Sequence, residues 1–248
     1  MNKTNRMKYF LSLISLVVLL QSCSQNNKAE ADFIKKTLLY QDDFSSMNSN
    51  DWIAELQAES GNFVGINNGA LEIDVPKGAT VWYKHKLEGD ILIEYKACVV
   101  DKDGPNDRVS DLNCFWMASD PRNIDDLFDS PRKASGKFHD YDTLQLYYVG
   151  MGGHNNTKTR FRRYDGKGNK PLLPGHDLSD KVDLIFPNKT CEIRLITMGN
   201  QVQFFRDGKL IYDFVDESPY TKGWFGIRTI ENHMTIDDFK VYRIEKKK

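Results

Sequence analysis

The chain has 248 residues, a formal net charge of −1 and 12% aromatic residues. This length is sufficient for one large β domain or two small ones. Because general binding to nucleic acid requires a net basic surface, the near-neutral charge argues against a nucleic-acid-binding protein.

The first 22 residues have the pattern of a bacterial export signal. Three basic residues precede an apolar run from Tyr9 to Leu20, which is too short to span a membrane as a helix. The following Ser22 and Cys23 resemble the lipobox of bacterial lipoproteins. The resemblance implies cleavage before Cys23, lipidation of its thiol and attachment to the cell envelope, where we expect the outer membrane. An ordinary signal peptide is the alternative. Residues 23–37 are predicted to form a flexible tether.

From Leu38 onwards, short strand-like segments alternate with turns. Helical periodicity is scarce, which favours an all-β protein. Asn68-Gly69 and Asp207-Gly208 supply the positive φ of tight hairpins, and we expect a further turn at Pro76–Gly78. The sequence predicts a single two-sheet antiparallel β-sandwich over residues 38–245. A basic tail at residues 246–248 should be frayed.

The loop from Asp101 to Asp111 gathers oxygen ligands of the kind that calcium prefers, at Asp101, Asp103, Asn106 and Asp107. Its spacing is not that of the helix-loop-helix calcium site. A solvated acidic turn is therefore the first interpretation, and a structural calcium ion is the alternative. No other metal or cofactor is predicted.

Three further cysteines, Cys98, Cys114 and Cys191, lack the spacing of a zinc site. Cys98 and Cys114 lie within apolar strands, so buried free thiols are expected, since unpaired cysteine is among the most buried residue types. The sequence leaves open whether these two form a disulfide.

The segment from Tyr141 to Tyr164 predicts a β-hairpin with an unusually polar face. Side chains of a strand point alternately to opposite faces. One face should be apolar, with Leu144, Leu146 and Tyr148 on its first strand. The other is expected to combine the polar side chains of both strands: Thr143, Gln145, Tyr147, Lys158, Arg160, Arg162 and Tyr164. A solvated strand face paired with acidic neighbours is the alternative interpretation of these arginines.

The polar groups of this hairpin suit β-elimination at a uronic acid. That reaction needs groups that neutralise the carboxylate, a base, and an acid for the leaving oxygen. Arg160 and Arg162 are candidates for holding the carboxylate, with Gln145 as a further donor. The candidates for proton transfer are Tyr147, Tyr164, His154 and His139.

Hydrolysis has weaker support from the sequence. The E-x-D-x-x-E strand typical of laminarinase-type glycosidases is absent. The adjacent pairs Asp125-Asp126 and Asp237-Asp238 point to opposite faces if they lie on strands, which does not suit two carboxylates acting across one bond. A non-catalytic glycan-binding protein and a glycoside hydrolase with an unrecognised acid pair are the two alternatives to a lyase.

Several segments resemble known families. Asp42-Asp43-Phe44, Asn68-Gly69 and the closing Ile236–Val241 are similar to concanavalin A-like sandwiches. More narrowly, the chain resembles the YesU-like lipoproteins in the segments NCFWMASDP (Asn113–Pro121), LQLYYVGMGG (Leu144–Gly153), TRFRRYDG (Thr159–Gly166) and GWFGIRT (Gly223–Thr229).

The resemblance implies a jelly roll whose concave sheet faces a carbohydrate. It also implies a protein whose gene lies among genes for the breakdown of pectin and other acidic polysaccharides. It does not define a reaction. Asn113, Trp116 and Arg228 are predicted to line the same cleft as the hairpin. We therefore predict an envelope-anchored jelly roll that acts on acidic plant-type polysaccharide or oligosaccharide by β-elimination.

Overall fold

The computed structural model describes residues 32–46, 48 and 50–247. The predicted signal peptide and the predicted lipidation site at Cys23 lie outside the described residues, as does most of the predicted tether. Within the described part, no helix is long and apolar enough to cross a membrane.

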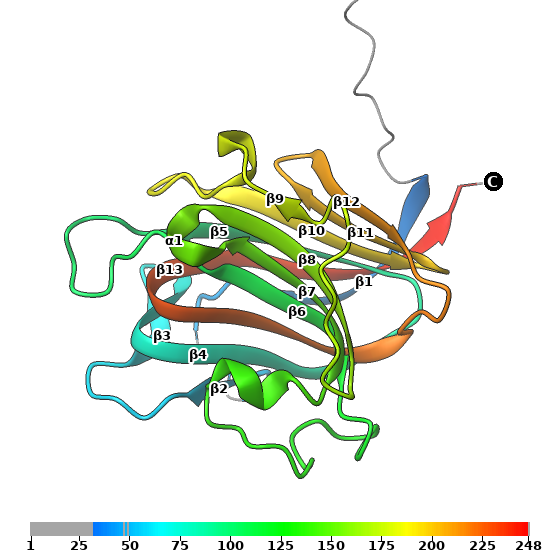
Figure 1. Ribbon diagram of the computed structural model, residues 1–248, viewed down its shortest axis with the longest axis horizontal. Helices are drawn as coiled ribbons and strands as arrows, with labels where there is room; N and C mark the ends of the chain where they lie inside the picture. Colours follow the sequence, from blue (N-terminus) through cyan, green and yellow to red (C-terminus); the bar gives the residue numbers. More distant parts are fainter. Residues whose placement is uncertain (1–31, 47, 49, 248) are drawn as a thin grey trace, which may run out of the picture. The chain divides into compact units, whose positions relative to one another are not determined.

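The regular secondary structure of the described chain is almost entirely β, as the turn-rich sequence predicted (Figure 1). The strands are β1 (Phe33–Asp42), β2 (Trp52–Leu56), β3 (Phe63–Asn67), β4 (Ala70–Glu88), β5 (Ile91–Val99), β6 (Leu112–Ser119), β7 (Gln145–Gly152), β8 (Lys158–Asp165), β9 (Asp177–Leu178), β10 (Cys191–Met198), β11 (Gln201–Arg206), β12 (Lys209–Val215) and β13 (Lys222–Lys246). Short helical turns are η1 (Phe138–Tyr141), α1 (Gly153–Asn156) and η2 (Lys181–Asp183).

Two long strands, β4 and β13, connect the two layers of a jelly roll. Residues 222–230 of β13 pair with residues 78–88 of β4 on one side and with β6 on the other. The sheet then extends from β6 to β7, β8 and β9, each paired with the one before it. Beyond a register shift after Ile230, β13 pairs with the first part of β4 on one side and with β5 on the other. This sheet extends from β5 to β10, β11 and β12, each paired with the one before it. The first layer is thus β2-β4-β13-β6-β7-β8-β9, and the second contains β3, β5, β10, β11, β12 and β1.

The predicted turn at Pro76–Gly78 is wrong, because these residues continue β4 across the change of layer. A register shift lies opposite them, between Ile230 and Asn232 of β13. Proline is tolerated within a sheet at such an irregularity, where a ladder hydrogen bond is already missing. A local turn signal therefore marks a bend inside one strand.

The first strand begins earlier than expected. β1 starts at Phe33, inside the predicted tether, and pairs with the end of β13, with Phe33 opposite Lys246. Most side chains of its first half are exposed. This pairing joins the two ends of the domain, so no local pattern reveals it.

Apolar side chains fill the space between the layers, including Trp116, Tyr147 and Phe161 from the first layer. A second aromatic cluster lies on the outer face of the first layer, where the 120–144 segment packs over Trp82, Phe115 and Trp224. This segment therefore covers one part of that face. Cys98, Cys114 and Cys191 are free thiols, which answers the open disulfide question.

Candidate functional site

A cleft of about 390 Å³ lies on the outer face of the first layer, beside the part that the 120–144 segment covers. Its size is within the range of small-ligand pockets. Strands β6, β7, β8 and β13 supply most of its walls. The lining residues are Asp111, Asn113, Phe138, Tyr148, Gly150, Gly153, His154, Lys158, Arg160, Arg162, Tyr164, Lys170, Arg228 and Ile230.

The cleft unites six of the ten residues predicted to take part in catalysis or substrate binding: Asn113, His154, Arg160, Arg162, Tyr164 and Arg228. The prediction that Arg160, Arg162 and Tyr164 share one face of their strand is confirmed. The other four lie elsewhere: Gln145, Tyr147, Trp116 and His139.

The predicted face of the first strand of the hairpin is wrong. In the observed register Tyr148 lies opposite Arg162, and Tyr147 lies opposite Arg163. Tyr148 therefore shares the cleft face with the arginines, while Tyr147 points between the layers. Alternation orders side chains within one strand, but the register to the facing strand is set by the connecting turn.

Tyr147 and Trp116 are core residues. The Tyr147 hydroxyl donates to Asp216 Oδ2 at 2.6 Å and accepts from the Tyr220 amide at 3.0 Å. The Trp116 ring packs on Tyr147 at 5.5 Å between centroids. Burial and the neighbouring carboxylate of Asp216 raise the pKa of Tyr147. Neither side chain reaches the cleft.

Gln145 and His139 also do not line the cleft. Gln145 is at the start of β7, opposite Asp165, and its side chain lies against the turn at Gly166. The His139 side chain is 71% exposed and lies 3.3 Å from Asp140. His139 lies on the short helical turn η1, and its outward direction could not be read from its place before the hairpin.

Arg228 is a buried guanidinium at the base of the cleft, only 2% exposed. Both of its hydrogen bonds are donated by Nη1, to the carbonyl oxygens of Ala79 (2.8 Å) and Thr229. The rings of Phe138 and Tyr141 lie 5.6 and 5.8 Å from its Cζ. Burial lowers its pKa. Among the described residues no carboxylate forms an ion pair with it, so its charge is without a direct counter-ion.

Arg162 is the second cleft guanidinium without an ion pair in the described part of the chain, and it donates to the Lys170 carbonyl. Arg160 is different, because Asp177 accepts from its Nε at 3.0 Å and from its Nη2 at 3.2 Å. That hydrogen bonding raises the pKa of Arg160. Lys158 lies 3.9 Å from Asp177, and Lys170 pairs with Asp142.

Two phenols, Tyr148 and Tyr164, lie between these cations. The Tyr164 hydroxyl is buried and has no hydrogen-bond partner, and burial raises its pKa. Burial also raises the pKa of Tyr148, and the positive charges of Arg228 and Arg162 partly offset this increase. Gly150 leaves room for the Tyr148 hydroxyl, since a Cβ at this position would overlap it. Both phenols therefore remain protonated near neutral pH.

His154 is held at the rim by an unusual turn. His154, Asn155 and Asn156 have φ values of 55°, 56° and 56°, which place three successive non-glycine residues in the left-handed region. Such conformations cost about 1–2 kcal/mol each, and they often occur at functional sites. The element drawn as α1 in Figure 1 is therefore not a right-handed helix over these residues.

Contacts on both sides stabilise this turn. Arg108 Nη1 donates to Asn155 Oδ1 at 2.7 Å, and the Asn156 side chain exchanges two hydrogen bonds with the Ile185 backbone, at 2.8 and 2.9 Å. His154 Nε2 lies 2.6 Å from Arg160 Nη1. Because arginine can only donate, His154 Nε2 is the acceptor in this contact.

Asp111 is the one carboxylate among the residues that line the cleft. Its Oδ2 accepts from Arg108 Nη2 at 2.5 Å and from Ser110 Oγ at 2.7 Å. The backbone of Asp111 has a φ of 55°. The paired carboxylates of a typical glycosidase are therefore not found among the lining residues.

Sequence reasoning missed four polar or aromatic cleft residues: Asp111, Phe138, Tyr148 and Lys170. Strand alternation with the correct register would have found Tyr148. Asp111 and Lys170 come from loops and Phe138 from the short helical turn η1, where no strand periodicity indicates the direction of a side chain.

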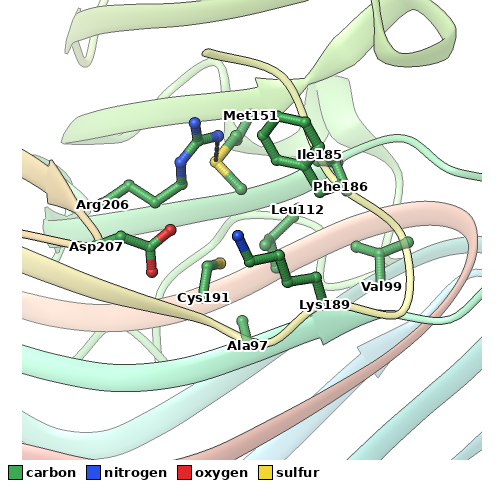
Figure 2. A pocket seen from close by; sticks show the side chains of 10 residues that line it. All are labelled: Ala97, Val99, Leu112, Met151, Ile185, Phe186, Lys189, Cys191, Arg206 and Asp207. Carbon is green, nitrogen blue, oxygen red and sulfur yellow. Dashed lines mark hydrogen bonds between the residues drawn. The ribbon is translucent and has the colours of Figure 1, made fainter. Parts of the chain in front are cut away.

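A second hollow lies between the layers near the ends of β5 and β10 (Figure 2). It holds only about 10 Å³, which is room for roughly one water molecule. Arg206 Nη1 donates to the Leu184 carbonyl at 2.7 Å and lies 3.7 Å from Met151 Sδ. Burial raises the pKa of the Cys191 thiol to about 12, so this cysteine is a poor nucleophile. The larger cleft is the candidate site.

The fold and its cleft define a concanavalin A-like jelly roll with a cationic, phenol-rich groove. The chain belongs to the family described as "Domain of unknown function (DUF6250)", which it matches over residues 73–239. No curated protein matches the chain.

Solved structures share the fold at low sequence identity. A protein of unknown function with a galectin-like fold from Bacillus subtilis is 18% identical, with a TM-score of 0.65 over 86% of this chain and 99% of its own. The carbohydrate-binding module CBM66 from Bacillus subtilis is 12% identical, with a TM-score of 0.51 over 77% of this chain and 95% of its own. An endo-β-1,3-glucanase from Pyrococcus furiosus is 10% identical, with a TM-score of 0.56 over 88% of this chain and 100% of its own. At these identities the likeness establishes the jelly roll and nothing finer.

Proposed function

We propose that the cleft binds uronate-containing oligosaccharides and that the protein cleaves them by β-elimination. The observation that carries this proposal is Arg228, a guanidinium that is 2% exposed and lacks a carboxylate partner in the described chain. A buried, uncompensated charge is costly. A substrate carboxylate at Arg228 would offset that cost, and the guanidinium of Arg162 lines the same cleft.

The chemistry of elimination gives each cleft residue a role. Binding the uronate carboxylate to Arg228 and Arg162 makes the hydrogen on the adjacent C5 more acidic. A base removes that proton, the C5–H electrons form the C4=C5 double bond, and the C4–O bond breaks. The leaving oxygen keeps the electron pair of that bond and takes up a proton.

His154 and Tyr148 fit the two proton-transfer roles best. His154 Nε2 can accept the C5 proton once the Arg160 guanidinium, which now donates to it, hydrogen-bonds to the substrate instead. The raised pKa of Tyr148 keeps its phenol protonated, as a general acid must be. Tyr164 is the alternative acid, since its buried hydroxyl has no partner.

A sugar ligand is also supported by the likeness to proteins that act on or bind glycans. The fold is shared with endo-β-1,3-glucanase and with a carbohydrate-binding module. We further propose that the chain is related to the YesU-like lipoproteins and that its ligand derives from an acidic plant-type polysaccharide. We also propose that a lipid on Cys23 anchors the protein to the bacterial outer membrane.

The second candidate is a non-catalytic glycan-binding protein that uses the same cleft. One observation favours it over a hydrolase: Asp111 is the single carboxylate among the lining residues, and its Oδ2 is already engaged by Arg108 and Ser110. A binding protein requires only the cations, amides and rings. A glycoside hydrolase would need a second acid that these residues do not supply.

The test is to incubate the purified protein with pectic and glucuronan-type oligosaccharides. Elimination is followed by the ultraviolet absorbance of the unsaturated product, and hydrolysis by new reducing ends without that absorbance. We expect absorbance to rise with wild-type protein and to fall to background with Tyr148→Phe and His154→Gln. Binding in calorimetry without either product would refute the lyase and support the binding protein.

A further inference from the structure

We propose that Glu72, Asp74 and His233 bind a divalent transition-metal ion on the outer face of the second layer. One carboxylate oxygen from each acid and one imidazole nitrogen lie within 4.8 Å of one another. Ligand atoms around a shared metal ion, at about 2.0–2.2 Å from it, have separations in this range. The proposal is independent of the cleft and its function.

Two neighbouring strands hold the three side chains. Glu72 and Asp74 are two residues apart on β4 and therefore point to the same face. His233 on β13 lies directly opposite Asp74, and Thr235 lies opposite Glu72. Ligands on paired strands are positioned more rigidly than ligands on loops.

Each of the three side chains has a further partner that fixes its orientation. Asp107 Oδ1 lies 2.8 Å from His233 Nδ1, and Asp107 is itself held by the amides of Lys102 (2.6 Å) and Gly104 (3.0 Å). Asn106 Nδ2 donates to Asp74 Oδ1 at 2.8 Å. The side-chain amide Nδ2 of Asn67 donates to Glu72 Oε2.

This arrangement matches the pattern of known metal centres. A metal-binding histidine typically donates its other ring N–H to a carboxylate, and carboxylate ligands are themselves hydrogen-bonded. Here Nδ1–H would donate to Asp107 and leave Nε2, which lies 2.8 Å from Glu72 Oε1, for the metal. The loop from Asp101 to Asp111, for which a calcium site was the alternative interpretation, thus supplies partners behind the ligands, through Asn106 and Asp107.

The charges also indicate a cation. Three carboxylates, Glu72, Asp74 and Asp107, surround one imidazole, and no lysine or arginine of the described chain forms an ion pair with any of them. The side chains of His233, Glu72 and Asp107 are only 19%, 14% and 4% exposed. An imidazolium compensates one negative charge, whereas a divalent ion compensates two.

The ligand types favour Zn²⁺ or Mn²⁺ over Ca²⁺. Imidazole with carboxylates suits zinc and other first-row metals, whereas calcium takes oxygen ligands almost exclusively. The competing arrangement is a plain ion pair in which both ring nitrogens of His233 are protonated and donate to Asp107 and Glu72.

The experiment uses untagged protein stripped with EDTA and freed of chelator. Zn²⁺, Mn²⁺ and Ca²⁺ are titrated separately by calorimetry, and thermal unfolding is measured with and without each ion. We expect one Zn²⁺ or Mn²⁺ per chain and a rise in Tm, because an ion that binds only the folded state stabilises it. Asp74→Asn and His233→Gln should abolish the rise, and Asp107→Asn should weaken binding about 10- to 100-fold.

His85→Gln is the matched control. His85 Nε2 also contacts a carboxylate, Asp51 Oδ1 at 2.5 Å, but among the described residues His85 does not belong to a group of three metal-ligating side chains. This variant should keep the metal-dependent rise in Tm. Circular dichroism of the metal-free variants tests whether each is folded. The proposal is overturned if wild-type protein binds neither Zn²⁺ nor Mn²⁺ stoichiometrically, or if folded Asp74→Asn and His233→Gln bind them as wild type does.

Discussion

Replacing Arg228 by methionine is the sharpest test of the anionic cleft. The side chain is 2% exposed and donates two hydrogen bonds to backbone carbonyls. Methionine has a similar length and is flexible enough to fill irregular space. The substitution therefore removes the charge while it largely preserves packing between Phe138 and Tyr141.

The expected effect on stability is small because two terms oppose each other. Losing two hydrogen bonds from a charged donor costs about 1.5–3 kcal/mol each, or about 3–6 kcal/mol together. Removing an uncompensated buried charge returns several kcal/mol. The free energy of unfolding should therefore change by no more than about 2 kcal/mol, which urea denaturation can measure.

The expected effect on ligand affinity is large. Truncating one partner of a buried charge pair costs about 2–5 kcal/mol of binding free energy. This corresponds to an increase of Kd by roughly 30- to 4,000-fold. The change in Kd is measured by isothermal titration calorimetry, with an acidic oligosaccharide that the wild-type protein binds.

Arg206→Met is the matched control. Arg206 is also buried and donates to backbone carbonyls, of Leu184 and Val182, but it lies outside the cleft. Its replacement should leave affinity unchanged. If Arg228→Met folds and binds the oligosaccharide as tightly as wild type, Arg228 does not hold a substrate carboxylate and the anionic-cleft hypothesis fails.

Three further predictions follow from the placement of the tyrosines, one glycine and one histidine. Tyr148→Phe should reduce turnover by about 10²–10⁴-fold and leave the free energy of unfolding unchanged. Tyr147→Phe should leave turnover unchanged and lower the free energy of unfolding by about 1–3 kcal/mol, because the buried Asp216 carboxylate loses a donor. Steady-state rates and urea titrations measure both quantities, and the reverse pattern would show that Tyr147 belongs to the site. Gly150→Ala should weaken oligosaccharide binding in calorimetry, since its Cβ would overlap the Tyr148 hydroxyl; unaltered Kd would contradict that position of the phenol. Burial lowers the pKa of His176 below its ordinary 6.5. Below pH 6.5 the unfolded chain therefore binds more protons at this histidine than the folded protein does. The stability that His176 contributes above pH 6.5 is lost on acidification. His176→Phe should therefore unfold with a shallower pH dependence between about pH 7.5 and about pH 5.5, and an unchanged slope would contradict it.

Local patterns predicted the faces of single strands but not the way strands meet. Arg160, Arg162 and Tyr164 were correctly placed together, because alternation along β8 is a property of that strand alone. Tyr147 was misplaced, because its face relative to β8 depends on the turn at residues 153–156. That turn contains three left-handed non-glycine residues, which no ordinary hairpin signal indicates.

Composition and turn spacing were thus sufficient to determine an all-β sandwich, with cationic residues concentrated on β8. Only the tertiary structure decided which residues face those cations. Arg228 on β13 and Tyr148 on β7 reach one cleft because both strands pair with β6. The grouping of Glu72 and Asp74 with His233 likewise depends on the pairing of β4 with β13. Alternation is a local property of the backbone, whereas register and strand order depend on contacts between residues far apart in the chain.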